Sequence, residues 1–319
     1  MQKTFVGSVA KHIRPSIAIN YTRDVRLGVL INQGMNFLRH EHLLWQDNSQ
    51  GILRPTTTYI ELIAYCPRDC DGCYITEENR KDKSVISMEN ADKIVILSRN
   101  IGIRLFTLLG GEPMSDETVP VIRHLLENNP DLTFIVCTNG DYIATKKGAL
   151  DDILLRNNLS VSLSIDGFQG TNDLLRGRNS YANVASSARY LKSQRCLFGA
   201  TTTLRPHNYL EPTSEEFIDH LKKMGFKFVA YSFTDDLGQA ARDEAIERIE
   251  QIHGPVLLYT ALFGYSGERN TSSLAKVVSI DRHGTILDHR RKRVEIGDIS
   301  HDLSDIARNA RWREKYLQY

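Results

Sequence analysis

Short runs of apolar and β-branched residues alternate with longer amphipathic segments from about residue 57 onward. This alternation is typical of βα units on a parallel sheet. The predicted strands are Thr57–Tyr65, Ile103–Gly111, Leu132–Gly140, Leu159–Gly167, Leu197–Arg205 and Lys227–Asp235. The predicted helices are Met88–Asn100, Asp116–Asn128, Thr145–Asn157, Tyr181–Ser193, Ser214–Met224 and Ala240 to about Ala261. Six consecutive units favour a barrel, complete or open, over a doubly wound sheet.

The two ends of the chain do not follow this pattern. Residues 1–56 combine a β-like piece, Gly28–Ile31, with a short helix around Met35–Trp45, and could form a cap, a lid or an extra strand. After about residue 270 we predict a hairpin of Val277–Asp281 and Thr285–Asp288, turning at His283-Gly284, and then a terminal helix from Leu303. The division is an N-terminal extension or cap (1–56), an α/β core (57–265) and a C-terminal appendage (266–319).

Charge and cysteine content exclude several classes of protein. The 319 residues carry 40 Lys and Arg against 39 Asp and Glu, without the basic excess of a nucleic-acid-binding protein, so no nucleic-acid partner is expected. The longest apolar stretch, Pro255 to Tyr265, is shorter than the roughly 18 to 20 residues that span a bilayer. Five cysteines, three of them within eight residues, do not form a disulfide framework. We therefore expect a cytoplasmic protein with no membrane partner.

Distinctive polar clusters stand where the predicted strands end. They are a cysteine loop after the first strand, Gly110-Gly111-Glu112-Pro113 after the second, Thr138-Asn139-Gly140 after the third and Ser164-Ile165-Asp166-Gly167 after the fourth. In βα barrels, the carboxyl ends of the strands carry the chemistry. We therefore expect these clusters to meet at one site.

The cysteine loop, Cys66-x3-Cys70-x2-Cys73, is the strongest chemical feature of the chain. Three thiolates on one loop can bind three irons of a [4Fe–4S] cluster and leave the fourth iron open to a small molecule. The alternative is a structural zinc site in a protein without catalysis. Zinc sites usually add a fourth Cys or His nearby, whereas the closest histidines here are His40, His42 and His124. The spacing favours the iron–sulfur cluster.

With Tyr74 after the third cysteine, the loop resembles the signature of the radical S-adenosylmethionine (radical SAM) superfamily. Leu109-Gly110-Gly111-Glu112-Pro113 resembles the family's GGEP element, Thr138-Asn139-Gly140 its TNG element, and Ser164 with Arg176 a serine and arginine twelve positions apart. Any one of these motifs alone would be interpreted as a turn or a surface residue. All four, however, occur in family order over roughly residues 57–240. The resemblance implies a partial (βα)6 TIM-like barrel with one [4Fe–4S] cluster and S-adenosyl-L-methionine as cofactors.

The resemblance also implies roles for individual residues. Cys66, Cys70 and Cys73 would ligate iron. S-adenosylmethionine would chelate the open iron and be cleaved by one electron to a 5′-deoxyadenosyl radical, which takes hydrogen from the substrate. The implied cofactor contacts are Gly110 and Gly111 for close approach of the methionyl group, Glu112 for its ammonium, Ser164 and Arg176 for its carboxylate, Tyr74 for the adenine, and Thr138 and Asn139 for the ribose or substrate. Asp166 either caps the next helix or contacts substrate.

The C-terminal segment resembles the appendage called SPASM or twitch, in which cysteines bind auxiliary clusters. No cysteine follows Cys196, and Asp288 stands where such a cysteine is expected. The appendage is therefore degenerate, and we predict one cluster only. The basic run from His289 to Arg293, near Arg282, is either a solvated edge or a site for an anionic substrate.

Four further residues are candidate catalytic groups. Cys137 precedes Thr138 and is either a hydrogen-atom donor or a buried small side chain, whereas Cys196 starts a strand, far from the expected site. Tyr231, Asp235 and Asp236 come at the end of the sixth strand and are candidate acid/base groups or substrate contacts.

The first hypothesis for the substrate is a small polar natural-product intermediate, a sugar or a nucleoside. The alternative is epimerisation or crosslinking of a ribosomal peptide. Either reaction needs an electron donor, such as flavodoxin or ferredoxin, as a partner.

Overall fold

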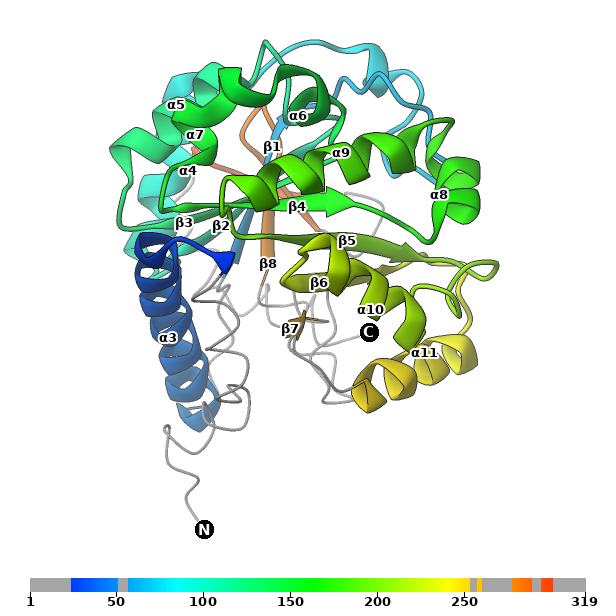
Figure 1. The fold of residues 1–319 in the computed structure, drawn as a ribbon. Coiled ribbons are helices and arrows are strands. Elements are labelled where there is room, and N and C mark those ends of the chain that lie inside the picture. The colour runs from blue at the N-terminus through cyan, green and yellow to red at the C-terminus, as the bar shows by residue number, and fades with distance from the viewer. Residues whose placement is uncertain (1–23, 51–56, 253–256, 260–276, 289–293, 301–319) are drawn as a thin grey trace.

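The computed structural model describes residues 24–50, 57–252, 257–259, 277–288 and 294–300. Over these ranges ten strands form one sheet in the order β10-β9-β8-β1-β2-β3-β4-β5-β6-β7 (Figure 1). The strands are β1 (Thr57–Ile63), β2 (Leu105–Gly110), β3 (Thr133–Thr138), β4 (Leu159–Ser164), β5 (Phe198–Leu204), β6 (Phe228–Phe233), β7 (Leu257–Tyr259), β8 (Val277–Ile280), β9 (Thr285–Asp288) and β10 (Val294–Asp298).

The first seven strands pair in parallel in the order of the sequence. Helices connect them, and within the described ranges no pairing joins the edge strands β7 and β10. The sheet is thus a partial barrel, as predicted. None of the helices in these ranges is long and apolar enough to cross a lipid bilayer.

The connecting helices agree with the sequence pattern in most places. They are α4 (Met88–Asn100), α5 (Val119–Asn128), α8 (Gln169–Arg176), α9 (Ser180–Ser193), α10 (Glu215–Met224) and α11 (Gln239–Gln251). The single helix predicted over Thr145–Asn157 is wrong. Its place is taken by α6 (Asp141–Lys146), a 3-10 turn η2 (Lys147–Leu150) and the short α7 (Asp151–Leu154). Lys147 has φ +37, a conformation that an α-helix cannot contain.

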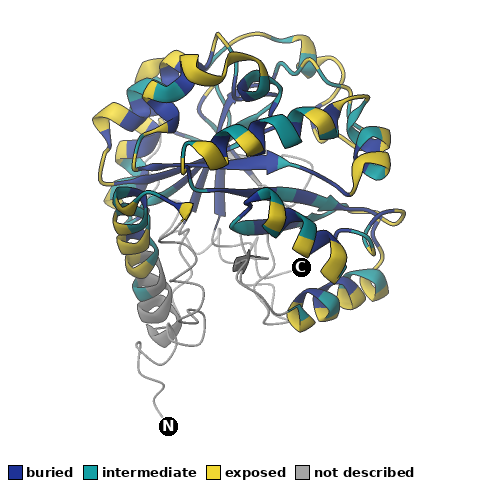
Figure 2. Ribbon diagram, viewed as in Figure 1, coloured by how far each residue is buried: buried dark blue, intermediate teal, exposed yellow. Residues whose placement is uncertain are grey.

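The two faces of the sheet differ in chemistry. One face packs alternate strand residues, such as Leu62, Phe106 and Phe134, against the helices. These residues are buried, and the exposed positions of the helices lie on their sides away from the sheet (Figure 2). By alternation the opposite face, here called the inner face, carries hydroxyl side chains together with a small apolar cluster of Leu105, Ile135 and Ala230. The hydroxyl side chains are Thr107, Ser160, Ser162, Thr201, Thr203 and Ser232.

The N-terminal region differs from its prediction. Gly28–Ile31 is not β-like but belongs to the 24-residue helix α3 (Leu27–Gln50). Asn32 and Asn36, one turn apart, donate to the carbonyls of Pro130 and Asp131. These bonds dock the helix beside the start of β3, and this long-range contact overrides the β-branched local sequence.

The predicted hairpin is confirmed as β8 and β9, which pair antiparallel. Because β8 also pairs in parallel with β1, the appendage continues the main sheet. The helix predicted from Ala240 to about Ala261 ends at Gln251, and β7 lies beyond it. The predicted terminal helix from Leu303 falls outside the described residues, and the three-part domain division stays a prediction.

Two glycines allow β1 and β2 to converge at the start of the cysteine loop. The Gly111 N–H donates to the Ile63 carbonyl (2.7 Å) and the Glu112 N–H to the Tyr65 carbonyl (2.8 Å). A Cβ on Gly111 would lie 2.1 Å from the Tyr65 oxygen, and one on Gly110, at φ +146, would lie 2.1 Å from the Ile63 oxygen. The expected reason for these glycines was the approach of a methionyl group. In the structure, the carbonyls of Ile63 and Tyr65 already require them, and the approach of a methionyl group stays a prediction.

We predict that Gly111→Ala lowers the free energy of unfolding by about 1–3 kcal/mol, because the strand ends must separate to admit a methyl group. Gly170→Ala is the control, since a Cβ there would meet nothing within 4 Å. Its stability should equal or slightly exceed that of the wild type. The measurement is urea denaturation followed by circular dichroism. Equal stability of the two variants would contradict this account of the strand ends.

Candidate functional site

The polar clusters predicted to follow the strand ends do meet at one edge of the sheet. Glu112, after β2, bonds Thr138, at the end of β3. Asp166, after β4, pairs with Arg176. Contacts with these strand-end segments also anchor the cysteine loop, which follows β1. The carboxyl ends of β1 to β5 therefore form a single site.

The cysteine loop carries three thiols that differ in exposure. Cys66 and Cys70 are half-buried and Cys73 is exposed. Burial raises the pKa of Cys66 to about 12, and the charges of Cys70 and Cys73 act on it in the same direction. Within the described ranges no three Cys, His, Asp or Glu side chains converge into a group that could hold a metal ion. The loop supplies three soft ligands, but their sulfur atoms do not surround one point as the ligands of a bound metal ion would.

Arg68 anchors the first half of the loop. Its Nε and Nη2 atoms donate to the two carboxylate oxygens of Asp141 at 2.6 Å each, a bidentate pair. Asn183 donates to the same carboxylate (2.8 Å), and Arg68 also reaches the Arg176 carbonyl (3.0 Å). Arg80 forms an ion pair with Asp69 and so ties the loop to the segment that follows it.

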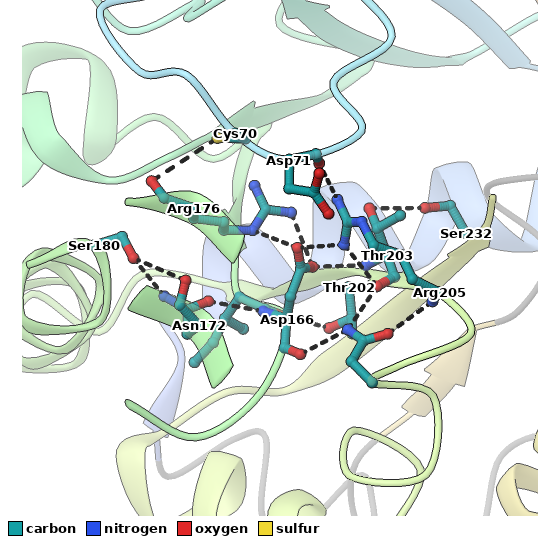
Figure 3. Close-up of polar contacts among 12 residues, drawn as sticks. Cys70, Asp71, Asp166, Asn172, Arg176, Ser180, Thr202, Thr203, Arg205 and Ser232 are labelled. Atoms are coloured by element: carbon teal, nitrogen blue, oxygen red, sulfur yellow. Dashed lines mark hydrogen bonds and ion pairs between the residues drawn. The ribbon is translucent and has the colours of Figure 1, made fainter. Parts of the chain in front are cut away.

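Asp166 is the centre of a buried ion cluster (Figure 3). Arg176 lies 2.8 Å from Oδ2 through Nε and 2.9 Å from Oδ1 through Nη2. Arg205 donates to Oδ2 (2.9 Å) and the Thr203 N–H to Oδ1 (2.8 Å). The carboxylate thus accepts from two guanidinium groups and one backbone amide.

This arrangement corrects one expectation, the capping role of Asp166. Asp166 does not cap the next helix, because α8 begins after Phe168 and has no side-chain cap. Two nitrogens of Arg176 face Asp166, and its expected contact with a cofactor carboxylate stays a prediction. Ser164 lies half-buried at the end of β4, as predicted.

Glu112 joins the ends of β2 and β3. It is buried, and its Oε1 accepts from the Thr138 hydroxyl (2.5 Å) and the Met114 N–H (2.8 Å). Oε2 accepts from the Asn139 N–H (2.8 Å), which leaves capacity for one more donor. Burial raises the pKa of Glu112 to about 7, against the opposing effect of these three donors.

Hydrogen bonds within the chain hold most of the residues around Glu112. Asn139 accepts from the Asp141 N–H through Oδ1 (2.8 Å), while its Nδ2 is buried and has no hydrogen-bond partner in the described part of the chain. Tyr74 is exposed, and its hydroxyl donates to the Gly110 carbonyl (2.8 Å). The Asn139 amide is therefore a buried donor available to a ligand.

The four candidate catalytic residues do not come together. Tyr231 is buried in the core on the helix-facing side of β6, where its hydroxyl donates to the Pro212 carbonyl (2.9 Å). It is therefore turned away from the inner face. Asp235 and Asp236 are exposed on the loop after β6. Cys137 lies on the inner face, bonded by the Thr201 hydroxyl (3.8 Å), and burial raises its pKa to about 12.

The guanidinium group of Arg282 contacts residues of the barrel. It donates to the buried Glu61 of β1 (2.9 Å), forms an ion pair with Asp82 and donates to Ser84 (2.9 Å). Its guanidinium is thus bonded at all three nitrogens, which argues against a role for Arg282 in binding an anionic substrate. The basic run 289–293 and the Asp288 side chain lie outside the described residues.

Three residues of the site were missed in the sequence: Arg68, Asp141 and Arg205. Each stands beside a recognised motif, since Arg68 lies between two cysteines, Asp141 follows Gly140, and Arg205 follows β5. The position of Arg205 after a strand end could have marked it as a site residue. Its pairing with Asp166 could not have been predicted, because no sequence pattern pairs an arginine with a carboxylate 39 residues away.

Glu112 predicts a pH dependence of stability. Its pKa in the folded chain, about 7, lies above its ordinary value of 4.5, so folding binds a proton between these values. The resulting stabilisation is present below about pH 4.5 and is lost as pH rises through 7. Across this window the free energy of unfolding of the wild type should fall relative to that of Glu112→Gln. A difference that stays constant with pH would contradict the shifted pKa.

The chain resembles several solved structures in fold. Streptococcus suis SuiB, solved bound to the precursor peptide SuiA, matches with a TM-score of 0.64 and 14% identity, over 88% of this chain and 71% of that one. Native anSMEcpe with bound AdoMet matches with a TM-score of 0.60 and 15% identity, over 82% and 83%. An uncharacterized protein of Archaeoglobus fulgidus is 26% identical over 156 residues, which are 48% of this chain and 36% of that protein. The chain thus spans about a third of that relative's length.

The family model of the radical SAM superfamily matches residues 60–224, which is more than half of the chain. This span contains the cysteine loop, the Glu112 segment and the Asp166 cluster. Enzymes of this family use a [4Fe–4S] cluster and S-adenosylmethionine for radical chemistry. The chain belongs to the radical SAM superfamily, whose members are enzymes that use these two cofactors.

Proposed function

We propose that this radical SAM enzyme abstracts hydrogen from a small polar substrate, a sugar- or nucleoside-type natural-product intermediate. The observation that carries this proposal is the hydroxyl lining of the inner face. Ser162 and Thr201 share a hydrogen bond (2.6 Å), and the Ser232 hydroxyl donates to Thr203 (3.2 Å). Hydroxyl groups can both donate and accept, so this face suits a substrate rich in hydroxyls.

The residues present fit the two cofactors. Cys66, Cys70 and Cys73 would hold the cluster, and the thiols have the softness that iron–sulfur clusters require. When bound, the cluster and S-adenosylmethionine supply a 5′-deoxyadenosyl radical by one-electron cleavage. The buried Asn139 Nδ2 is a free donor for a ligand oxygen, and Oε2 of Glu112 can accept one further donor such as an ammonium group.

The roles of the remaining candidate residues are also proposals. Cys137 is the candidate hydrogen-atom donor that lies on the inner face, whereas Tyr231 is placed in the core. A cytoplasmic flavodoxin or ferredoxin would supply the electron. The one-cluster prediction follows from the lack of cysteines after Cys196.

A peptide substrate is the alternative. The solved structures of SuiB and anSMEcpe include peptide complexes, with SuiA and with Cp18Cys, and both proteins share the fold of this chain. A shared fold at this low identity does not fix a substrate. The lining of the inner face favours the small polar compound.

We predict that Cys70→Ala abolishes 5′-deoxyadenosine formation, because one iron of the cluster loses its ligand. The protein is reconstituted with iron and sulfide without oxygen, mixed with S-adenosylmethionine and dithionite, and assayed by chromatography. Cys196→Ala is the control, since Cys196 is buried at the opposite end of β5. It should retain iron and activity. Wild-type activity in Cys70→Ala would refute the cluster assignment.

We predict that Thr201→Val raises KM for the substrate about tenfold or more, because a substrate hydroxyl loses its partner. Sets of nucleosides, amino sugars and short peptides are screened for 5′-deoxyadenosine formation above the substrate-free rate. Thr202→Val is the matched control, since its hydroxyl donates to the Ile165 carbonyl and by alternation faces away from the inner face. Stimulation by peptides alone, or equal KM values in the two variants, would overturn the proposed substrate class.

A further inference from the structure

The turn between Cys70 and Cys73 is held from two sides. The Asp71 N–H donates to the carbonyl of Leu175, in the last turn of α8 (2.8 Å). The Asp71 carbonyl accepts from Nη2 of Arg205 (3.0 Å). Gly72 is in the left-handed region, at φ +60, and a Cβ there would lie 3.5 Å from Nε of Arg205. The Arg205 guanidinium therefore lies directly against the turn that carries two of the three iron ligands (Figure 3).

Arg205 is itself rigidly positioned. Its side chain is 6% exposed and its Nη1 donates to Asp166 (2.9 Å) and to the Thr203 carbonyl (3.2 Å). Its backbone N–H donates to Oδ1 of Asn208 (2.7 Å), whose Nδ2 bonds the Asp166 carbonyl (3.0 Å). The side chain thus has little freedom to leave the cysteine turn.

The charges of this cluster do not cancel. Arg176 and Arg205 carry two positive charges, and Asp166 carries one negative charge that both share. The Asp71 carboxylate is largely exposed, and its Oδ2 lies 3.9 Å from Nε2 of His207. A net positive charge is therefore buried beside the cysteine turn, where the low dielectric strengthens its field.

We propose that Arg205 is a positioning residue for the iron–sulfur cluster. It holds the Cys70–Cys73 turn through the Asp71 carbonyl, and its buried charge favours the reduced form of the cluster. This inference concerns the shared radical SAM machinery and does not depend on the proposed substrate. No step of the reaction passes through Arg205, so its effect is measured on the cluster rather than on turnover.

The test compares Arg205→Gln, which removes the charge, with Arg205→Lys, which keeps it but cannot reach both Asp166 and Asp71. Arg242→Gln is the matched control, because Arg242 also bonds loop carbonyls, those of Leu237 and Thr234, but away from the cysteine loop. Each reconstituted protein is titrated electrochemically and the reduced cluster is followed by electron paramagnetic resonance. Iron loss to a chelator is timed in parallel.

In Arg205→Gln the ratio of reduced to oxidised cluster at a fixed applied potential should fall at least tenfold, which is about 59 mV for a one-electron couple. Arg205→Lys should keep a potential near that of the wild type and lose iron several times faster. Arg242→Gln should match the wild type in both measurements. A wild-type potential in Arg205→Gln, or wild-type iron retention in Arg205→Lys, would overturn the proposal. Should Arg205→Gln fail to fold, Arg205→Met replaces it in the titration.

Discussion

The buried carboxylate of Asp166 is the interaction on which the site depends. Removing a charge from water is costly, and a single partner rarely compensates that cost. Asp166 is compensated by Arg176, at the end of α8, and by Arg205 and the Thr203 amide, both at the end of β5. Arg205 also donates to the Asp71 carbonyl in the cysteine turn. The side chain that stabilises the buried Asp166 carboxylate therefore also holds the turn that carries two of the iron ligands. Loss of the Asp166 carboxylate would leave two buried guanidinium groups without a counter-charge.

Glu112 makes a similar contact between strand ends two strands away. Asp166 follows β4 and accepts the Thr203 amide of β5, while Glu112 follows β2 and accepts the Asn139 amide just after β3. In both cases a buried carboxylate at a strand end binds the backbone of the next strand. The difference lies in the partners, since Asp166 has two cations and Glu112 has only neutral donors. This difference explains why burial raises the pKa of Glu112 toward neutrality.

Hydrophobic periodicity was sufficient to locate the sheet. All six predicted strands begin within two residues of the observed ones, because their apolar runs are short and end at polar motifs. The sequence also predicted that those motifs meet at one site, because the carboxyl ends of parallel strands lie at one edge of the sheet. Periodicity failed where contacts distant in sequence decide the outcome. Helix α3 is held by carbonyls about a hundred residues away. Tyr231 is a different case, because the alternation of β6 itself places its side chain on the helix-facing side with Val229.

The C-terminal hairpin is coupled to the cysteine loop through β1. Strand β8 pairs with β1 along Thr57–Ile60, and β1 leads directly into Cys66. Arg282, at the turn of the hairpin, binds Glu61 of β1 and also Asp82, which follows the cysteine loop. One guanidinium therefore joins the strand before the loop to the segment after it. A shift of the hairpin would therefore strain the segments on both sides of the cysteine loop, so the hairpin supports the cluster site mechanically.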